Sequence, residues 1–467
     1  PDVKLTGGLR WTSDHKHFID IPSELLANGY GYMPIGVVNQ AWNQWTGRFA
    51  ANWTPKLDFT DQTLVYGSFA HGYKAGGANP PGAVLFSYAG ISGSLSGGGN
   101  GVPIHPLTFK PEFIDAYELG TKNTLADGGI TLNGDVFFYN YTGYQISRIV
   151  DRTAINDNFN ATVRGAELEA TYEPIPGLKF NFAGGYESTR VDNGQSSVDL
   201  MDRTAGHPGW VLLKPFVTLP SNCIFPDYVV AALLLAGNQG SQGNGAVSAC
   251  GTAYHDDLDP VVGGNDDGGY YHYNNGNPYW TNPGFGGIDP GPPGNSYPYH
   301  VNGFPGGAYP GFDPLAGTPG DPYMGQNTFN GVDYGPAPNN GEGFAKDLSG
   351  HQLPNAPHFT VSLSGEYTIP VSEDWAATLH SDFYWQSQSY ARIFNDNPYD
   401  KIRGYSNVNL ALILTSANGW QVMGYLKNVF DTTAITGTFL NSDDSGLTTN
   451  VFLTDPRLFG VRVTKNW

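Results

Sequence analysis

Three features are scarce in this 467-residue chain, and each scarcity excludes a class of protein. No run of 18 or more apolar residues occurs, so a transmembrane helix is not expected. Only 23 Lys and Arg residues stand against 42 Asp and Glu, a formal net charge of −19, which argues against nucleic-acid binding because that requires a basic surface. The sequence motifs G-x-S-x-G, H-E-x-x-H, C-x-x-C and the P-loop are absent, and we do not expect an enzyme.

Cysteine is also scarce, with Cys223 and Cys250 as the only two. Both fall in the same long connection between predicted strands. In an oxidising compartment a local disulfide between them is favoured over two unrelated thiols. Closing a loop of this length would stabilise it by about 3–4 kcal/mol in the chain-entropy description.

The stretch 111–190 shows what the chain does contain, which is alternation of apolar and polar residues. Val136 and Phe138 fall on one side of a strand and Asp135 on the other, and the same period of two recurs around Glu167 and Glu169. A soluble antiparallel sheet with one buried face would give the same alternation. The length of the segments, about 9–11 residues or more, and the carboxylates on the polar face favour a membrane barrel with a hydrated lumen lined by Glu167 and Glu169.

Twelve strands are predicted on this basis, and their connections alternate in length. The strands are expected at about 3–11, 45–55, 61–73, 112–125, 129–147, 160–173, 177–190, 356–369, 374–389, 402–416, 419–430 and 456–467. Short turns are expected at 55–61, 126–129, 174–177, 370–374 and 416–419, and long loops at 12–44, 74–111, 148–159, 191–355, 390–401 and 431–455. Short turns on one side and long loops on the other are typical of outer-membrane barrels. The faces of the strands at 61–73 and 419–430 stay unassigned.

Several motifs in order along the chain resemble the TonB-dependent outer-membrane receptor family. They are GLRWTSDHK (8–16), LVYGSFAHGYKAGG (64–77), PEFIDAYELGTK (111–122), GAELEA (165–170), GHQLPNAP (350–357), KNVFD (427–431) and DPRLFGV (455–461), followed by a terminal aromatic residue. Each motif alone is weak, but their order and spacing are specific.

The resemblance implies an all-β fold: a transmembrane antiparallel β-barrel of 22 strands, of which this chain would hold about the last twelve, with a large extracellular loop insertion. The first residues already alternate like a strand and no export signal precedes them, so we expect a longer protein whose N-terminal plug and earlier strands lie outside this sequence. The expected division is barrel strands at 1–190, a loop or cap at 191–355, and barrel strands at 356–467. In the family the terminal aromatic, here Trp467, serves recognition by the barrel-assembly machinery.

The loop 191–355 is rich in Gly, Pro, Asn and Tyr and contains no Lys or Arg from Pro215 to Ala345. Its composition fits either a flexible linker or a cap that packs on its own aromatic rings, and we favour the cap. One short helix is expected at 228–236. Aromatic side chains without positive charge suit neutral, hydroxyl-rich ligands such as sugars. The expected ligand-binding residues are Tyr270, Tyr271, Tyr273, Tyr279, Trp280, Tyr297 and Tyr299.

Two further expectations concern charge in the loops. Carboxylates gather at Asp256, Asp257, Asp259, Asp266 and Asp267, the hard-oxygen chemistry of Ca²⁺, although solvated acidic turns give the same pattern and are favoured over a calcium site. Anionic ferric siderophores would need cations from other loops, for which Lys74, Arg148, Arg152 and Arg392 are the candidates. The scattered histidines, among them His71, His207 and His351, show no ligand spacing.

Taken together, the sequence predicts an outer-membrane TonB-dependent transporter of a Gram-negative bacterium that imports a scarce nutrient of the siderophore, vitamin or carbohydrate class. Its expected partners are outer-membrane lipid, the TonB energy-coupling complex acting through the plug, the barrel-assembly machinery and a small-molecule nutrient, with no nucleic acid. The alternative is a surface, adhesion or assembly protein that uses the barrel as an anchor. An open porin is a third interpretation.

Overall fold

The fold is dominated by one antiparallel sheet of twelve strands. Each strand of this sheet pairs with the strand of the same sheet that follows it in the sequence. The computed structural model describes residues 2–20, 36–79, 108–150, 153–213, 223–228, 230–231, 288–289, 300–301, 328–335, 338–441 and 448–467. The strands of the sheet are β1 (Asp2–Asp20), β2 (Gly36–Thr54), β3 (Gln62–Lys74), β6 (Glu112–Leu125), β7 (Ile130–Val150), β8 (Thr153–Ile175), β9 (Leu178–Val191), β18 (Phe359–Pro370), β19 (Trp375–Gln386), β22 (Tyr405–Ser416), β23 (Trp420–Lys427) and β26 (Leu458–Lys465). The number and the order of the predicted strands are confirmed.

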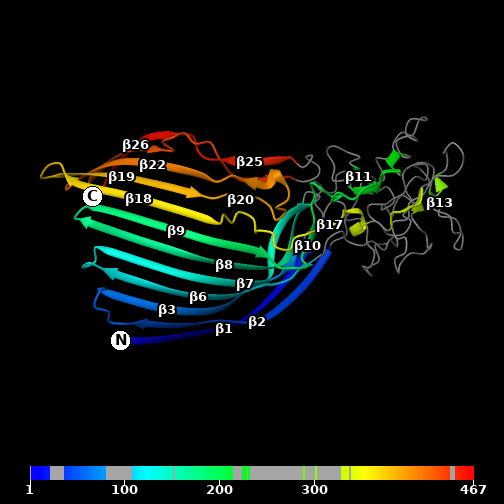
Figure 1. Ribbon diagram of the computed structural model, residues 1–467, viewed down its shortest axis with the longest axis horizontal. Helices are drawn as coiled ribbons and strands as arrows, with labels where there is room; N and C mark the ends of the chain where they lie inside the picture. Colours follow the sequence, from blue (N-terminus) through cyan, green and yellow to red (C-terminus); the bar gives the residue numbers. More distant parts are fainter. Residues whose placement is uncertain are drawn as a thin grey trace.

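Short paired segments connect these strands at one end of the sheet, where Figure 1 places β10, β17 and β20. They are β4 (Gly77–Ala78) with β5 (Thr108–Phe109), β10 (Ser196–Val198) with β17 (Ala345–Asp347), β11 (Trp210–Leu213) with β12 (Cys223–Pro226), β13 (Ile288–Asp289) with β14 (His300–Val301), β15 (Thr328–Phe329) with β16 (Val332–Asp333), β20 (Ser389–Tyr390) with β21 (Lys401–Ile402), and β24 (Ile435–Leu440) with β25 (Thr449–Leu453), besides the 3-10 turns η3 (Pro338–Gly341) and η4 (Pro398–Asp400). No helix among the described residues is long and apolar enough to cross a membrane.

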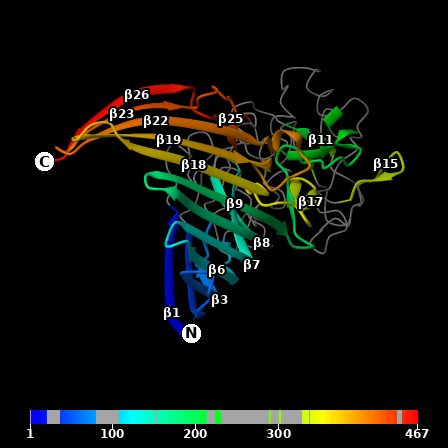
Figure 2. The same ribbon diagram turned by 60° about the vertical axis from the view of Figure 1, so that its left-hand side comes forward.

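The sheet curves into an open trough, which Figure 2 shows from the side. The polar face is the concave one. A cavity of about 330 Å³ lies on it, and its lining includes Asn133, Glu169 and Asp382. The opposite, convex face carries exposed apolar side chains such as Leu119 and Val136, which are register partners on β6 and β7. The alternation in the sequence therefore becomes an apolar outside and a polar inside, as in a membrane barrel.

The two strands whose faces the sequence left unassigned obey the same rule. In β3, Phe69 packs on Tyr117 of the convex face, whereas the Tyr66 hydroxyl donates a hydrogen bond of 2.6 Å to Glu118 on the concave face. In β23, Val422 pairs with Val463 and therefore lies on the convex face. Tertiary register assigns these faces because the local alternation is interrupted by small and polar residues.

Two of the predicted long loops are wrong in extent. Residues 148–159 belong to the hairpin of β7 and β8, in which Arg148 pairs with Ile155 and the Ser147 hydroxyl lies 2.5 Å from the Asn156 amide oxygen. Likewise the ladder of β1 and β2 continues to Asp20 and Gly36, so only 21–35 remain of the loop predicted at 12–44. In these extensions polar residues such as His15, His17 and Asn39 stand on the face that is apolar elsewhere, which weakens the period-two signal that marks a strand beside lipid.

The short helix predicted at 228–236 can be followed only in part. The backbone is helical at 227–228 and 230–231, and the remaining positions lie outside the described residues. The predicted division of the chain into domains stays a prediction.

Two of the motifs that resemble the receptor family contact each other around Asn428. This residue is 2% exposed and has a positive φ of 47°. Its side-chain amide donates to the carbonyl oxygens of Thr432 and Asp455 at 3.0 and 2.8 Å and accepts from the Thr432 N–H at 2.8 Å. The motif KNVFD is thus joined to DPRLFGV at the point where the chain leaves β23 and returns into β26.

A glycine in the GAELEA motif allows β7, β8 and β9 to approach each other closely. A Cβ atom at Gly165 would overlap the carbonyl oxygen of Tyr186 and the ring of Phe137. Gly165→Val is therefore expected to cost about 1–3 kcal/mol or more of barrel stability, because a backbone oxygen cannot move aside as a flexible side chain can. The measurement is the fraction of heat-modifiable, folded protein on electrophoresis.

Gly134→Val is the matched control for this variant. It lies on β7, and a Cβ atom there would be 3.6 Å from its neighbours, an ordinary contact. Equal folded fractions for the two variants would contradict the packing argument.

Candidate functional site

Most of the ligand and calcium residues expected from the sequence lie outside the described residues. This holds for Tyr270, Tyr271, Tyr273, Tyr279, Trp280, Tyr297, Tyr299, Asp256, Asp257, Asp259, Asp266 and Asp267, and for Cys250. Cys223 begins β12 and pairs in register with Leu213 of β11, so the disulfide stays a prediction. Trp467 ends the chain fully exposed, with the Lys465 ammonium 5.6 Å from its ring centre, and its role in assembly also stays a prediction.

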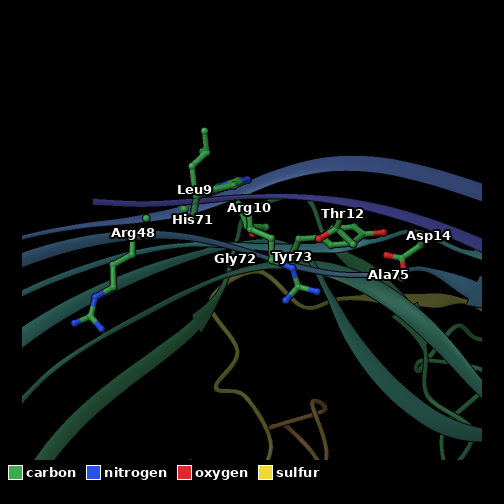
Figure 3. A pocket seen from close by; sticks show the side chains of 12 residues that line it. Leu9, Arg10, Thr12, Asp14, Arg48, His71, Gly72, Tyr73 and Ala75 are labelled. Atoms are coloured by element: carbon green, nitrogen blue, oxygen red, sulfur yellow. The ribbon is translucent and has the colours of Figure 1, made fainter. Parts of the chain in front are cut away.

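The structure instead brings together a hollow of about 750 Å³ where β3 parts from β2. The register of β2 with β3 ends at Gly47 and His71, whereas β1 and β2 stay paired beyond that level. Arg10 of β1 and Arg48 of β2 line the hollow and are both exposed. Figure 3 shows both guanidinium groups on the side of the sheet opposite to Leu9, which is the concave side.

Contacts between β1 and the segment after β3 cover this hollow on the side of the loops. The Lys16 ammonium donates to the Gly76 carbonyl oxygen, and a Cβ atom at Gly76 would meet the Trp42 ring at 2.9 Å. Side chains on the concave face of the long β1–β2 hairpin thereby border, on the side of the loops, the space that Arg10 and Arg48 line. Thr12 and Thr46 add hydroxyl groups to the same lining, and Asp14 adds one carboxylate beside the two guanidinium groups.

Arg10 and Arg48 form no ion pair within the part of the chain that the structure describes, which distinguishes them from the cations named as candidates from the sequence. Arg148 lies 2.7 Å from Asp157 and 2.8 Å from Glu342, and these carboxylates hold its pKa above the ordinary value in spite of burial. Arg392 is likewise paired with two aspartates. The ion pairs of these two arginines hold loops together and neutralise their charge, so the geometry does not support their assignment to anion binding.

The other two candidate cations, Lys74 and Arg152, give little further support for an anion site. The Lys74 ammonium lies 3.7 Å from the Glu112 carboxylate, and Arg152 lies outside the described residues. Arg10 and Arg48 were not singled out from the sequence. The alternation of β1 places Arg10 on the same side as Thr6 and could have indicated this residue. The hollow itself could not be predicted, because it depends on the way β1 and β2 lie together.

Further along the concave wall the sign of the charge changes. Glu118, Asp135, Glu167, Glu169 and Glu187 lie on β6 to β9, and Asp135 pairs in register with Glu167. Glu167 and Glu169 are exposed on the concave face, as expected for a hydrated lumen. No group of three or more His, Cys, Asp or Glu side chains placed to hold a metal ion occurs within the described ranges.

Comparison with known proteins adds the family. The model of the TonB-dependent receptor-like β-barrel matches residues 1–309, which is more than half of the chain. The chain belongs to the TonB-dependent receptor family. A search of curated proteins found no match.

One solved uptake receptor supports the fold of the chain, and others align with it less closely. The ferric yersiniabactin uptake receptor FyuA from Yersinia pestis aligns with 99% of this chain and 42% of its own length, at 13% identity and a TM-score of 0.50. The siderophore receptor PiuA from Acinetobacter baumannii (11% identity, TM-score 0.48) and the copper transporter OprC (13%, 0.47) cover 99% of this chain and 40% and 44% of their own lengths. The chain spans less than half of these structures, and at such identities the likeness concerns the fold alone.

Proposed function

We propose that this chain forms part of the barrel wall of a transporter in the outer membrane of a Gram-negative bacterium. The transporter imports a small-molecule nutrient through TonB-dependent energy coupling. The family match supports this, as do the apolar convex face and the polar concave face of the twelve-stranded sheet. The similar solved proteins are named as uptake receptors and a transporter. Barrel assembly directed by the terminal Trp467 belongs to the same proposal.

The ligand that the described residues fit best carries negative charge. The observation that supports this is the hollow with Arg10 and Arg48, two guanidinium groups that form no ion pair among the described residues, against the single lining carboxylate of Asp14. Guanidinium groups bind carboxylates through paired, charge-assisted hydrogen bonds, and two hydroxyl donors stand beside them. An anionic chelate is therefore favoured here over the neutral sugar expected from the aromatic residues of the long loop.

Uptake by whole cells tests the transport function. Cells that carry the complete natural protein are expected to accumulate a radiolabelled anionic ferric chelate, with ferric citrate and a ferric tricatecholate as probes and maltoheptaose as the neutral comparison. Accumulation should stop when the proton gradient is collapsed or the TonB protein is deleted. If deleting the gene changes the uptake of none of the three, while cell adhesion is lost, the surface-protein alternative replaces transport.

The double variant Arg10→Gln with Arg48→Gln tests the ligand class. Each lost charged hydrogen bond is worth about 1.5–3 kcal/mol, so the affinity for the transported ferric chelate is expected to fall by a factor on the order of 100 or more. Binding is measured by fluorescence quenching of the purified complete protein. Lys4→Gln, on the same face of β1 near its start, is the matched control and should bind as the wild type does. Unchanged affinity in the arginine variant would exclude this hollow as the anion site.

A further inference from the structure

The convex face of the β1–β2 hairpin carries two histidines beyond its tryptophan pair. Trp11 and Trp45 contact each other with ring centres 4.9 Å apart, and aromatic residues of this kind are typical of the membrane interface in barrels. His15 and His17 follow on the same face of β1, four and six residues further along. Both histidines are exposed and lie on the loop side of the tryptophan pair.

The spacing of the two histidines puts both rings on one face of the strand, close enough for one ion to reach both after a rotation of the His15 side chain. Residues two apart in a strand point to the same side and lie about 6.8 Å apart along it. Ala41 is the register partner of His15, and its small side chain leaves the space beside the two rings open. Lys16, which stands between them in sequence, points to the other face, where its ammonium contacts Gly76. Among the described residues on this face of the hairpin, no Lys or Arg therefore opposes a positive ion at the two imidazoles.

One ring nitrogen of each histidine is already engaged by a neighbour. His17 Nδ1 lies 2.5 Å from the Asn39 side-chain oxygen across the hairpin, and because that oxygen only accepts, Nδ1 carries the proton. His15 Nε2 lies 3.3 Å from the Ser13 hydroxyl. His17 Nε2 is therefore left with a lone pair, and His15 offers one lone pair in either neutral tautomer. A second hydrogen bond that fixes the ring and its tautomer is what metal-binding histidines regularly show.

We propose that His15 and His17 form a binding site for a divalent transition-metal ion, Cu²⁺ in preference to Zn²⁺ or Ni²⁺, on the convex face of the β1–β2 hairpin. Imidazole nitrogen suits these three ions, and Cu²⁺ binds most tightly to a given set of nitrogen ligands. Two protein ligands leave the remaining coordination positions to water or to a chelator, which makes the site open to exchange. The site is separate from the hollow of Arg10 and Arg48, and its existence does not depend on the proposed transport function.

Titration with copper sulfate tests the proposal. The complete protein, purified in detergent without a histidine tag, is titrated by calorimetry and followed by electron paramagnetic resonance. His15→Gln and His17→Gln are each expected to weaken one Cu²⁺ site by at least about 10-fold, because the chelate is lost, and the double variant should lose one bound ion per chain. The spectrum of the wild type should show two nitrogen ligands at this site.

Two further variants separate a metal site from a general effect of histidine content. His380→Gln removes a histidine that lies between Glu366 and Asp382 and should leave the hairpin site unchanged. Asn39→Ala keeps both ligands but removes the acceptor of the His17 proton, so about a 10-fold loss of affinity is expected. The proposal is overturned if the His15 and His17 double variant binds as many Cu²⁺ ions as the wild type with the same affinities.

Discussion

Arg392→Met is expected to release the segment between β19 and β22 from the β10–β17 pair. The Arg392 guanidinium lies 2.8 Å from Asp199 and 2.7 Å from Asp400, whose side chains are 0% and 5% exposed. Removing the guanidinium leaves two buried carboxylates, with only the Lys346 ammonium, 3.7 Å from Asp199, nearby. Breaking a buried ion pair from one side costs about 3–5 kcal/mol. Hydrogen exchange at 389–402 and 196–203 should therefore rise sharply while exchange in the sheet stays slow.

This variant should also acquire a pH dependence. Burial raises the pKa of Asp400 in the folded protein, and the hydrogen bond from Arg392 opposes that rise. Without Arg392 the rise is larger, and an acid whose folded pKa lies above its unfolded pKa stabilises the fold as the pH falls. The defect of Arg392→Met is therefore expected to be greatest at neutral pH and to shrink on acidification.

Arg403→Met is the matched control for both effects. Arg403 is exposed, lies in the same connection as Arg392 and forms no ion pair within the described part of the chain. Its exchange pattern should equal that of the wild type at each pH. If Arg392→Met behaves in the same way as Arg403→Met, the buried ion pairs do not hold these segments together.

Asn428→Ala is expected to have the second large effect, on the return of the chain into β26. The variant leaves the carbonyl oxygens of Thr432 and Asp455 and the N–H of Thr432 without their partner in a partly buried turn. Each buried polar group left unpaired costs about 1–3 kcal/mol, and alanine is further disfavoured at the positive φ of 47°. Because water replaces some of these bonds, the free energy of unfolding is expected to fall by roughly 3–5 kcal/mol. The folded fraction after refolding into detergent measures it.

Two other substitutions dissect the Asn428 effect. Asn428→Asp keeps the acceptor for the Thr432 N–H but loses both donors, so its folded fraction should lie between those of the wild type and the alanine variant. Asn441→Ala removes a half-exposed amide that, among the described residues, donates to the Thr448 hydroxyl at 3.2 Å, and it should be neutral. A neutral Asn428→Ala would show that the backbone of the turn holds without this side chain.

The strands and their faces could be predicted because their signal is local. In strands such as β7 and β8 every second side chain meets an apolar surrounding, so residues like Val136 and Leu168 record the register of the sheet in the sequence itself. The same signal disappears where a hairpin rises beyond the apolar band. Ile155 is fully buried against Leu200, a contact between residues 45 positions apart, and no periodicity around 148–159 announces it.

The candidate site was harder to predict, because the sequence shows which residues are cationic but not which of them form ion pairs with carboxylates in the folded protein. Arg148 and Arg392 were named from the sequence as anion-binding residues, but carboxylates 194 and 193 positions away in the chain engage them. Arg10 and Arg48 stay free of such partners among the described residues because β3 parts from β2 at Gly47. The pair His15 and His17 could have been found from the sequence, since two histidines at strand spacing within SDHKH are visible there.

The sequence by itself determined the number of strands, their order and, in all but the strands at 61–73 and 419–430, the division into an apolar and a polar face. These are consequences of neighbouring residues that alternate against two different surroundings. Tertiary structure decided how far the hairpins extend, which arginines are neutralised and where a hollow opens in the wall. Those outcomes depend on side chains that meet across strands and loops far apart in the chain, and no local pattern encodes such meetings.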